Sequence, residues 1–297
     1  MVDDDGRGPN GGAPLPSGEN AAPAHPPELS DEELLRYSRQ ILLPGFDVGG
    51  QEALRAAHVL VIGAGGLGSP VCLYLAAAGV GEITVIDHDT VDLSNLQRQI
   101  AHTTADIGRA KVASAAARAA AINPQVRINP LAMAADDALL RVVMAGGAAA
   151  AAGAGTSARP VDCVLDCCDN FATRAAVNRA CQAARVPLVS GAAIRMEGQL
   201  AVFDFARSAT PCYACLYGDS GGDDLTCARN GVMAPLVGVI GSLQALAAIR
   251  VLARFGEPAH ATLSVFDGMR NAWRAMKIAA DPQCPVCGGA RPVTSAR

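Results

Sequence analysis

The stretch HVLVIGAGGLGSPVCLYLAAAGVGEITVIDHD, residues 58–89, decides the fold. Its pattern predicts a short apolar strand over 59–62, a glycine turn, a helix and a second strand. Gly63, Gly65 and Gly68 stand at the G-x-G-x-x-G spacing. Glycines at this spacing let the backbone turn tightly and approach a phosphate, and the start of the next helix offers free N–H donors to an anion. The stretch therefore predicts a nucleotide-binding βαβ unit.

Asp87 ends the second of these strands, where such folds place a carboxylate on a ribose hydroxyl. The same glycine pattern is typical of enzymes that bind NAD or FAD, and it also occurs as plain structure. The nucleotide is therefore left open at this point, and an NAD-dependent oxidoreductase is one alternative.

The composition excludes several classes of protein. The chain has 297 residues, 51% of them hydrophobic, which suffices for one large α/β domain or two small ones with a sizeable core. The formal net charge of -4, without a run of Lys or Arg, provides no excess of cations for a nucleic-acid backbone, so we expect no nucleic-acid partner. No apolar segment follows Met1, which predicts a cytoplasmic protein without a secretory signal.

The sequence indicates a tail and one domain. Residues 1–29 contain almost no large apolar side chains, so we expect a disordered N-terminal tail. At Ser30 a capping box of the S-x-x-E form begins the structured domain, which we place at 30–297. The low-complexity run at 146–160 is interpreted as an inserted surface loop without function.

Strands and helices alternate from the glycine turn to about residue 190, which predicts a Rossmann-like α/β fold with a mainly parallel sheet and helices on both faces. Beyond Gly191, alternation around Gly198 predicts antiparallel strands that extend the same sheet. We expect helices from the capping box at Ser30 to residue 41, over residues 51–57, 107–121, 136–145 and 171–185, and from residue 236. Further strands are expected over 126–131, 161–165, 188–190 and 263–266.

Residues 231–249 are apolar enough to be considered as a membrane span. Pro235 and Gln244 interrupt the segment, and nothing else in the chain resembles lipid-facing structure. We therefore expect no membrane association. Gly238 and Gly241 are expected to let this helix pack tightly against a neighbour in the core or at a dimer interface.

Two C-x-x-C pairs, Cys212 with Cys215 and Cys284 with Cys287, are the strongest chemical signal. Four thiolates paired in this way close a tetrahedral Zn²⁺ site with no open position, so the predicted site is structural and not catalytic. Reduced thiols without metal, or a redox pair, are the alternatives. Zinc here would pin the C-terminus to the loop that follows the antiparallel strands.

A second signal is SNLQRQ, residues 94–99, followed by Lys111. A dinucleotide enzyme has no need of an Arg and a Lys beside the phosphates, whereas a triphosphate requires such charges. Arg98 offers a bidentate fork and Lys111 a point charge, and together they can stabilise the charge that moves onto departing pyrophosphate. The alternative is that both are solvated helix residues. The sequence contains no P-loop pattern.

A third signal is DCCDN, residues 166–170, at the end of a predicted strand. Ligands bind at the carboxyl ends of parallel strands, and an acidic residue there can hold Mg²⁺ against phosphate oxygens. Asp169 is the candidate for this role. Alternatively, Asp169 and Asn170 cap the helix that follows, and the two interpretations are compatible.

Together these motifs make the chain resemble the MoeB/ThiF family of bacterial E1-like adenylyltransferases over about residues 29–289. The resemblance implies a homodimer that binds Mg·ATP and adenylates the C-terminal glycine of a small ubiquitin-like sulfur carrier. Two bound carriers would complete a heterotetramer. A separate sulfur donor is expected, because no rhodanese-like domain follows Arg297. The motifs that carry the resemblance are RYSRQ (36–40), GAGGLG, SNLQRQ, Lys111, CCDN, SGAAIRMEGQ, the paired cysteines and MAPLVGVIGSLQA.

The resemblance also implies roles for individual residues. Gly66 and Asp87 would contact the nucleotide, with Asp87 on the ribose, and Lys111 would neutralise the phosphates. Arg39 resembles the arginine that reaches the triphosphate from the other subunit, and Asp169 would take Mg²⁺. The residues that would border the phosphates or the metal are Ser94, Asn95, Leu96, Gln97, Arg98 and Asn170.

Two cysteines stand apart from the zinc pairs. Cys168 occupies a position where the family commonly has Thr, but it leaves Asp169 in place and is interpreted as tolerated. Cys227 lies where relatives use a cysteine for a covalent link to the carrier or to sulfur, and the neighbouring Arg229 favours the thiolate. Cys227 is therefore a candidate catalytic residue, with an inert exposed thiol as the alternative.

The sequence also carries hints about which carrier the chain acts on and in which pathway. IRMEGQ favours the molybdopterin branch, whereas RYSRQILL and the segment with Trp273 are closer to the thiamine branch. We expect the small subunit of molybdopterin synthase as the carrier, with a thiamine-pathway carrier as the alternative. An alternative that is not an enzyme is an inactive adaptor that only binds carrier tails. The nucleophile would be a carboxylate that is ionised at neutral pH, so no general base is required.

Overall fold

The computed structural model describes residues 28–147, 159–207, 210–218, 230–256 and 260–288. Most of the predicted tail and of the predicted insertion at 146–160 lies outside these ranges, so both interpretations stay predictions. Leu29, which we assigned to the tail, is described and buried. The domain therefore includes at least this residue before the capping box at Ser30, whose side chain accepts from the Glu33 N–H.

An eight-stranded sheet runs through the molecule in the order β3-β2-β1-β4-β5-β6-β7-β8. The first five strands in this order are parallel, and β6, β7 and β8 continue the sheet with antiparallel pairing. The predicted Rossmann-like sheet with an antiparallel extension is confirmed. The strands are β1 His58–Ile62, β2 Glu82–Ile86, β3 Arg127–Leu131, β4 Cys163–Asp166, β5 Leu188–Ile194, β6 Glu197–Phe203, β7 Thr262–Asp267 and β8 Ala272–Lys277.

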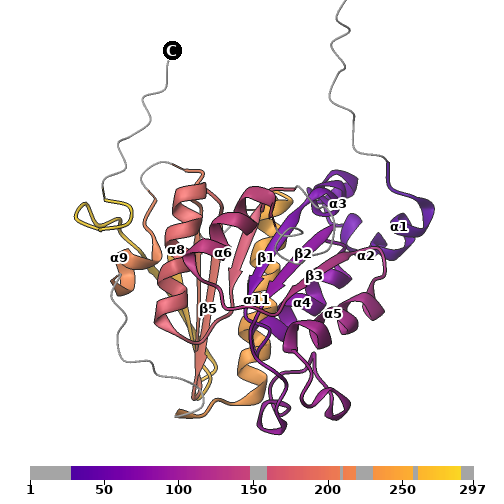
Figure 1. Cartoon of the computed structure of the whole chain (residues 1–297). Coiled ribbons are helices and arrows are strands. Elements are labelled where there is room, and N and C mark those ends of the chain that lie inside the picture. Colours follow the sequence, from indigo (N-terminus) through magenta and orange to yellow (C-terminus); the bar gives the residue numbers. More distant parts are fainter. Residues whose placement is uncertain (1–27, 148–158, 208–209, 219–229, 257–259, 289–297) are drawn as a thin grey trace, which may run out of the picture.

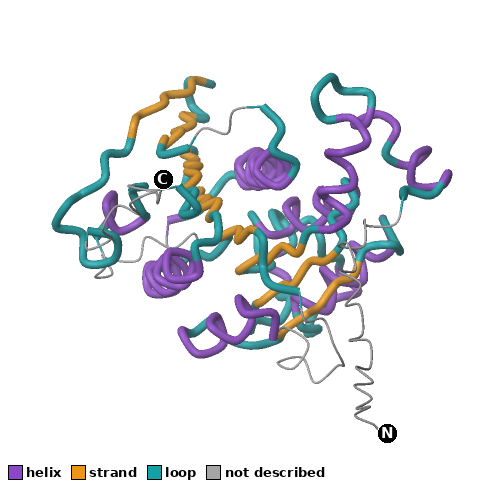
Figure 2. Tube along the Cα trace, turned by 90° about the horizontal axis from the view of Figure 1, so that it is seen from above, coloured by secondary structure: helices purple, strands orange, loops and turns teal. Residues whose placement is uncertain are grey.

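Helices cover both faces of the sheet (Figures 1 and 2). One core lies between the sheet and α4, α5 and α11 and includes Val61, Val71 and Val237. The other lies between the sheet and α6 and α8 and includes Ile62 and Val177. The helices are α1 Asp31–Arg36, α2 Ser38–Ile41, α3 Asp47–Ala56, α4 Gly68–Ala77, α5 Lys111–Ile122, α6 Asp137–Val142, α8 Phe171–Ala184, α9 Tyr213–Tyr217 and α11 Ala234–Leu252.

Several elements differ from the predictions. Helix α3 begins at Asp47, before the predicted start at residue 51. A Cβ on Gly50 would lie 2.9 Å from the ring of Phe46, so this glycine makes room for that ring within the helix. Strand β8 was not predicted, although it pairs along the whole of β7. Its exposed face lacks the apolar run that reveals a buried strand.

Helix α5 begins at Lys111, four residues later than predicted. The backbone just before it is hydrogen-bonded to the loop that follows β2. The Val91 N–H donates to the Arg109 carbonyl (2.9 Å), and the Gly108 N–H donates to the Val91 carbonyl (2.8 Å). Gly108 also has a positive φ of 85°, which a helix does not permit. These contacts place Lys111 at the start of the helix, beside the glycine turn.

Helix α11 is the one helix in the described part of the chain that is long and apolar enough to cross a membrane, judged by length and composition alone. It packs on α4 and on β5 and β6, and its buried side chains include Ile240 and Gln244. A Cβ on Gly241 would lie 2.5 Å from the Leu67 carbonyl, which confirms that this glycine permits close packing. Gly238 has nothing within 4 Å, so it does not serve packing within this chain.

Candidate active site

The glycine turn connects β1 to α4 and packs directly on the loop after β4. Gly63 has a φ of 95°, and a Cβ on it would lie 2.8 Å from the Cys167 carbonyl oxygen. A Cβ on Gly68 would lie 1.9 Å from the Gly63 carbonyl oxygen. Any side chain at either position would therefore force the backbone apart. The turn thus lies at the carboxyl ends of β1 and β4, where open α/β sheets bind ligands.

A buried histidine that the sequence did not single out supports this turn. One ring nitrogen of His102, Nε2, lies 3.0 Å from the Ala64 carbonyl oxygen, and Nδ1 lies 2.9 Å from the Ser114 hydroxyl. A carbonyl only accepts, so Nε2 carries the proton. Burial lowers the pKa of His102, which keeps the ring neutral. The Ala64 N–H donates in turn to the Asp87 carboxylate at 2.8 Å.

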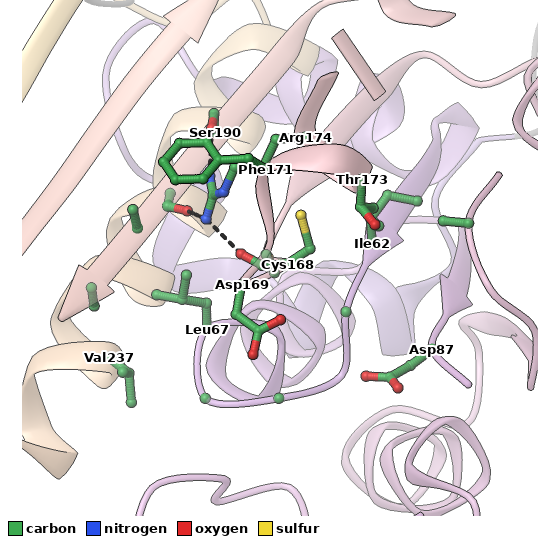
Figure 3. Close-up of a pocket in the computed structure, with 18 of the residues that line it drawn as sticks. Ile62, Leu67, Asp87, Cys168, Asp169, Phe171, Thr173, Arg174, Ser190 and Val237 are labelled. Carbon is green, nitrogen blue, oxygen red and sulfur yellow. Dashed lines mark hydrogen bonds between the residues drawn. The ribbon is translucent and has the colours of Figure 1, made fainter. Parts of the chain in front are cut away.

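A cavity of about 380 Å³ opens in front of the turn (Figure 3). Its nucleotide end is formed by the turn and by polar side chains that the sequence had indicated. Its sheet end lies over one face of β5 and β6. The nucleotide end comprises Gly65, Gly66, Asp87, Arg98, Lys111 and Asp169, and the sheet end comprises Phe171, Arg174, Ser190, Ala192, Gln199, Ala201, Tyr213 and Tyr217.

The two predicted cations lie at the nucleotide end. Lys111 is buried, and its Nζ donates to the Asp89 carboxylate at 2.7 Å. This hydrogen bond lowers the pKa of Asp89. Arg98 is half-buried and donates to the Ser94 carbonyl at 3.0 Å. Lys111 is therefore not a solvated helix residue, and the pair places positive charge beside the glycine turn.

Other predicted residues do not line the cavity. Asn170 accepts a hydrogen bond from the Thr173 N–H at 2.8 Å and is the N-cap of α8, as one of our two interpretations expected. Asp169 itself is exposed and lies next to the glycine turn (Figure 3). The predicted residues outside the cavity lining are Arg39, Ser94, Asn95, Leu96, Gln97 and Asn170. Cys227 lies outside the described residues.

A buried ion pair that the sequence did not reveal forms the floor between the two ends. Arg174 donates to the Asp166 carboxylate at 2.8 Å, to the Ser190 hydroxyl at 3.2 Å and to the Gly191 carbonyl at 2.9 Å. It also donates to the Cys168 carbonyl (Figure 3). The side chains of Arg174 and Asp166 are only 8% and 2% exposed. Arg174 therefore joins β4, β5 and α8, and its donors are committed to the protein.

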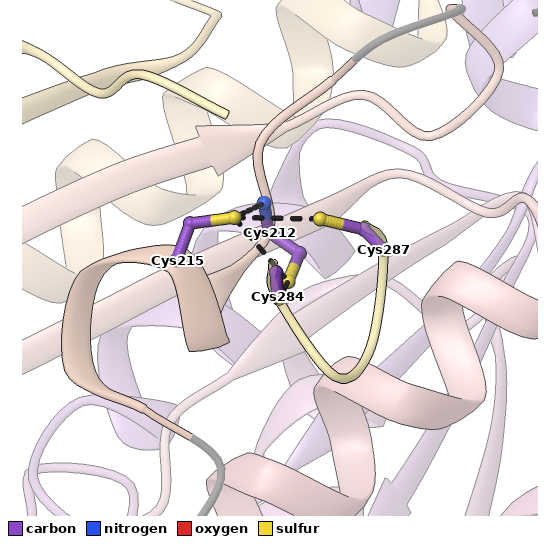
Figure 4. A group of neighbouring side chains, drawn as sticks. All are labelled: Cys212, Cys215, Cys284 and Cys287. Carbon is purple, nitrogen blue, oxygen red and sulfur yellow. Dashed lines mark hydrogen bonds between the residues drawn. The ribbon is translucent and has the colours of Figure 1, made fainter. Parts of the chain in front are cut away.

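The four paired cysteines converge from two segments far apart in the sequence (Figure 4). The Sγ atoms of Cys212 and Cys284 are 3.6 Å apart, and those of Cys215 and Cys287 are 3.3 Å apart. A tetrahedral zinc site with Zn–S bonds of about 2.3 Å requires sulfur atoms about 3.8 Å apart. All four sulfur atoms lie within 4.8 Å of one another. The cluster is therefore compatible with a single zinc ion.

The comparisons with known proteins agree with this geometry. A family model described as "ThiF family" matches residues 37–286, which is most of the chain. The chain belongs to the ThiF family. This assignment confirms the resemblance inferred from the motifs and favours adenylyl transfer over nicotinamide chemistry.

Two curated relatives match this ThiF-family chain along almost their whole length. The molybdopterin-synthase adenylyltransferase of Escherichia coli strain K12 is 51% identical over 261 residues, which cover 88% of this chain and 99% of that protein. The sulfur carrier protein ThiS adenylyltransferase of the same strain is 41% identical over 266 residues, with coverage of 88% and 98%. Both names describe adenylyl transfer, so this ThiF-family chain is a nucleotidyltransferase.

A solved structure supports the fold independently. The crystal structure of Escherichia coli MccB with ATP matches with a TM-score of 0.71 and 24% identity, and the match covers 85% of this chain and 74% of that chain. At this identity the likeness concerns the fold of the ThiF-family chain alone.

Removal of the buried guanidinium should destabilise the domain. We expect Arg174→Met to lower the free energy of unfolding by about 3–5 kcal/mol, because the Asp166 carboxylate would be left buried without its partner. Urea unfolding followed by circular dichroism measures this change. Arg179→Met on the same helix is the matched control, because its ion pair with Asp137 is exposed and its loss should cost within about 1 kcal/mol. Equal losses would contradict the structural role of Arg174.

Proposed function

We propose that this chain uses ATP to adenylate the C-terminal glycine of a small ubiquitin-like sulfur carrier, with release of pyrophosphate. The carrier that we propose is the small subunit of molybdopterin synthase. The observation that carries the proposal is the placement of Arg98 and Lys111 beside the glycine turn of a ThiF-family fold. The 51% identity to a molybdopterin-synthase adenylyltransferase supports the choice of carrier.

The charge distribution of the cavity suits this chemistry. A carboxylate oxygen of the carrier attacks the α-phosphorus, the bond from that phosphorus to the bridging oxygen of the β-phosphate breaks, and pyrophosphate leaves. The nucleophile is already ionised at neutral pH, so the protein need not supply a base. It must instead neutralise the charge on the phosphates and align the attacking group. Arg98 and Lys111 would supply that charge, and Asp87, which also lines the cavity, would accept from a ribose hydroxyl.

Asp169 is the residue that we propose for Mg²⁺. Its carboxylate is exposed, lines the nucleotide end and lies next to the turn that would hold the phosphates. Carboxylate oxygens combined with phosphate oxygens are the ligands that Mg²⁺ prefers in nucleotide sites. When bound, the ion would neutralise charge on the phosphates. Asp169 itself would fix the position of that charge relative to the turn.

A dimer accounts for the position of Arg39. This side chain is exposed on α2 and does not line the cavity of its own chain. Large apolar side chains near it are also exposed, with Leu35 at 77% and Leu42 at 71%. Exposed apolar side chains grouped in this way favour a protein interface. We therefore propose a homodimer in which Arg39 reaches the phosphates at the partner's cavity, and a heterotetramer when two carriers are bound.

A thiamine-type carrier is the second candidate. It is supported by the 41% identity to the ThiS adenylyltransferase, a lower value than the 51% for the molybdopterin-synthase relative. Pyrophosphate exchange with both types of carrier, each with and without its terminal glycine, separates the two. The carrier that supports exchange only when its terminal glycine is present is the substrate.

Loss of either cationic side chain should strongly reduce adenylation of the carrier. We expect Lys111→Ala and Arg98→Ala to lower carrier-dependent exchange between ATP and pyrophosphate by about 100-fold or more, because charge on the phosphates is no longer neutralised. Arg118→Ala is the matched control, since Arg118 is exposed on the same helix as Lys111 and is absent from the cavity lining. It should keep exchange within about twofold of the unmodified chain.

The same assay tests the dimer and the rival functions. Arg39→Ala chains should be inactive alone, and mixing them with Lys111→Ala chains should restore exchange at the one competent site of each mixed dimer. Exchange that is unaffected by Lys111→Ala would contradict the proposal. An NAD-dependent oxidoreductase would give no exchange at all. Carrier binding without any exchange would instead identify an inactive adaptor.

We propose that the four cysteines hold one structural zinc ion. Purified protein should contain about one zinc per chain, as measured by atomic emission. Cys212→Ser should lose the metal and lower the unfolding midpoint by about 5 °C or more, because two distant segments are no longer joined. Cys163→Ser is the control, since Cys163 is buried outside the cluster and its loss should leave the zinc content unchanged. A zinc-free parent protein would contradict the assignment.

A further inference from the structure

The sheet end of the cavity differs chemically from the nucleotide end. Ser190 pairs with Ala201 and Ala192 pairs with Gln199 across β5 and β6, so these four side chains share one face of the sheet. Three of the four are small, which leaves room above that face. Among the described residues that line this end, Arg174 is the one cation, and its donors are already committed to the protein. Glu197 on the same face of β6 also lines the cavity, so the sheet end suits a polar ligand such as a peptide backbone and not a phosphate.

Three aromatic side chains lie over this face of the sheet. The rings of Tyr213 and Tyr217, both on α9, have centroids 4.7 Å apart, and Phe171 of α8 lies 6.5 Å from Tyr217. The Tyr217 hydroxyl donates to the side-chain oxygen of Gln199 on β6. The Gln199 amide nitrogen donates in turn to Glu197 at 3.2 Å. Tyr217 and Gln199 therefore form a polar bridge from α9 to the sheet.

The bridge lies at the solvent-facing side of the cavity. Tyr217 is 38% exposed, Gln199 is half-buried and Glu197 is exposed. The buried pair of Arg174 and Asp166 lies farther inside. A chain end that enters the cavity from this side therefore meets Tyr217 and Gln199.

The position of Tyr217 is fixed by the protein and does not depend on the ligand. Helix α9 has five residues, too few to be stable by itself. Cys212 precedes it and Cys215 lies within it, so the four-cysteine cluster contacts the helix at two positions. The Tyr213 N–H also donates to the buried side chain of Asn178 at 2.9 Å. A side chain held in this way can discriminate between ligands, because its position is set before binding.

We propose that Tyr217 and Gln199 determine specificity for the acceptor: the carrier's extended C-terminal tail hydrogen-bonds to this pair as it enters the sheet end. The inference rests on the proposed function. An extended peptide offers backbone N–H and C=O groups. The Tyr217 O–H and one N–H of Gln199 are used within the bridge, but the phenol oxygen can still accept and the second amide N–H can still donate. ATP binds at the other end and makes no use of either side chain.

Separate measurements of the two substrates test this inference. Tyr217→Phe keeps the ring and removes one hydroxyl, and Gln199→Leu keeps the size and removes the amide. Each should raise KM for the molybdopterin-type carrier by about three- to tenfold, the effect of one lost hydrogen bond, and leave the equilibrium Kd for ATP within about twofold. Tyr74→Phe is the matched control, because Tyr74 is exposed on α4 and outside the cavity. It should change neither value.

The outcomes separate this inference from the proposed function. If the unmodified chain gives no carrier-dependent pyrophosphate exchange, the proposed function itself fails. If the unmodified chain is active and both variants keep its KM for the carrier, the specificity role of the pair is overturned. A parallel loss of ATP affinity and carrier affinity would also overturn it, because that pattern indicates a general structural role.

Discussion

The contact between the glycine turn and the loop after β4 is the constraint on which the site depends. There is no room for a Cβ at Gly68, 1.9 Å from the Gly63 carbonyl oxygen, or at Gly63, 2.8 Å from the Cys167 carbonyl oxygen. The close approach brings the carboxyl ends of β1 and β4 together. The cavity opens where these ends meet, so its position follows from backbone packing and not from the side chains that line it.

The site uses its charged side chains in two different ways. The guanidinium of Arg174 stabilises the fold, because its hydrogen bonds join β4, β5 and the start of α8. Lys111 and Arg98 instead border the open cavity, and Lys111 is held there by Asp89. A fixed frame with charges that face the cavity is the arrangement that electrostatic stabilisation of a leaving group requires. The sheet end would leave the other substrate a separate place to bind.

Local patterns in the sequence predicted the parts of the site that depend on local geometry. The glycine spacing fixed the turn, and the two C-x-x-C pairs predicted the cluster of four sulfur atoms. Lys111 was a candidate because phosphates require positive charge, and Asp169 because it follows a predicted strand. The N-cap role of Asn170 followed from its position just before a predicted helix. Except for the cluster, which joins two distant cysteine pairs, these features need only a few neighbouring residues to define them.

Other features depend on contacts between distant segments and could not be inferred in this way. His102 and Arg174 belong to no motif, and each becomes important only because tertiary packing places it against a backbone carbonyl. The late start of α5 results from hydrogen bonds between the backbone just before this helix and the loop after β2. The bridge between Tyr217 and Gln199 joins residues 18 positions apart on different elements. Such partners become visible only when the fold is known.

The central claim is that a nucleoside triphosphate binds with its phosphates between the glycine turn and the two cations. A crystal structure of the chain with magnesium and a non-hydrolysable ATP analogue tests this most directly. The account predicts phosphate oxygens within hydrogen-bond distance of Arg98 and Lys111, and the ribose on Asp87. A nucleotide bound elsewhere, with Arg98 and Lys111 directed into solvent, would contradict it.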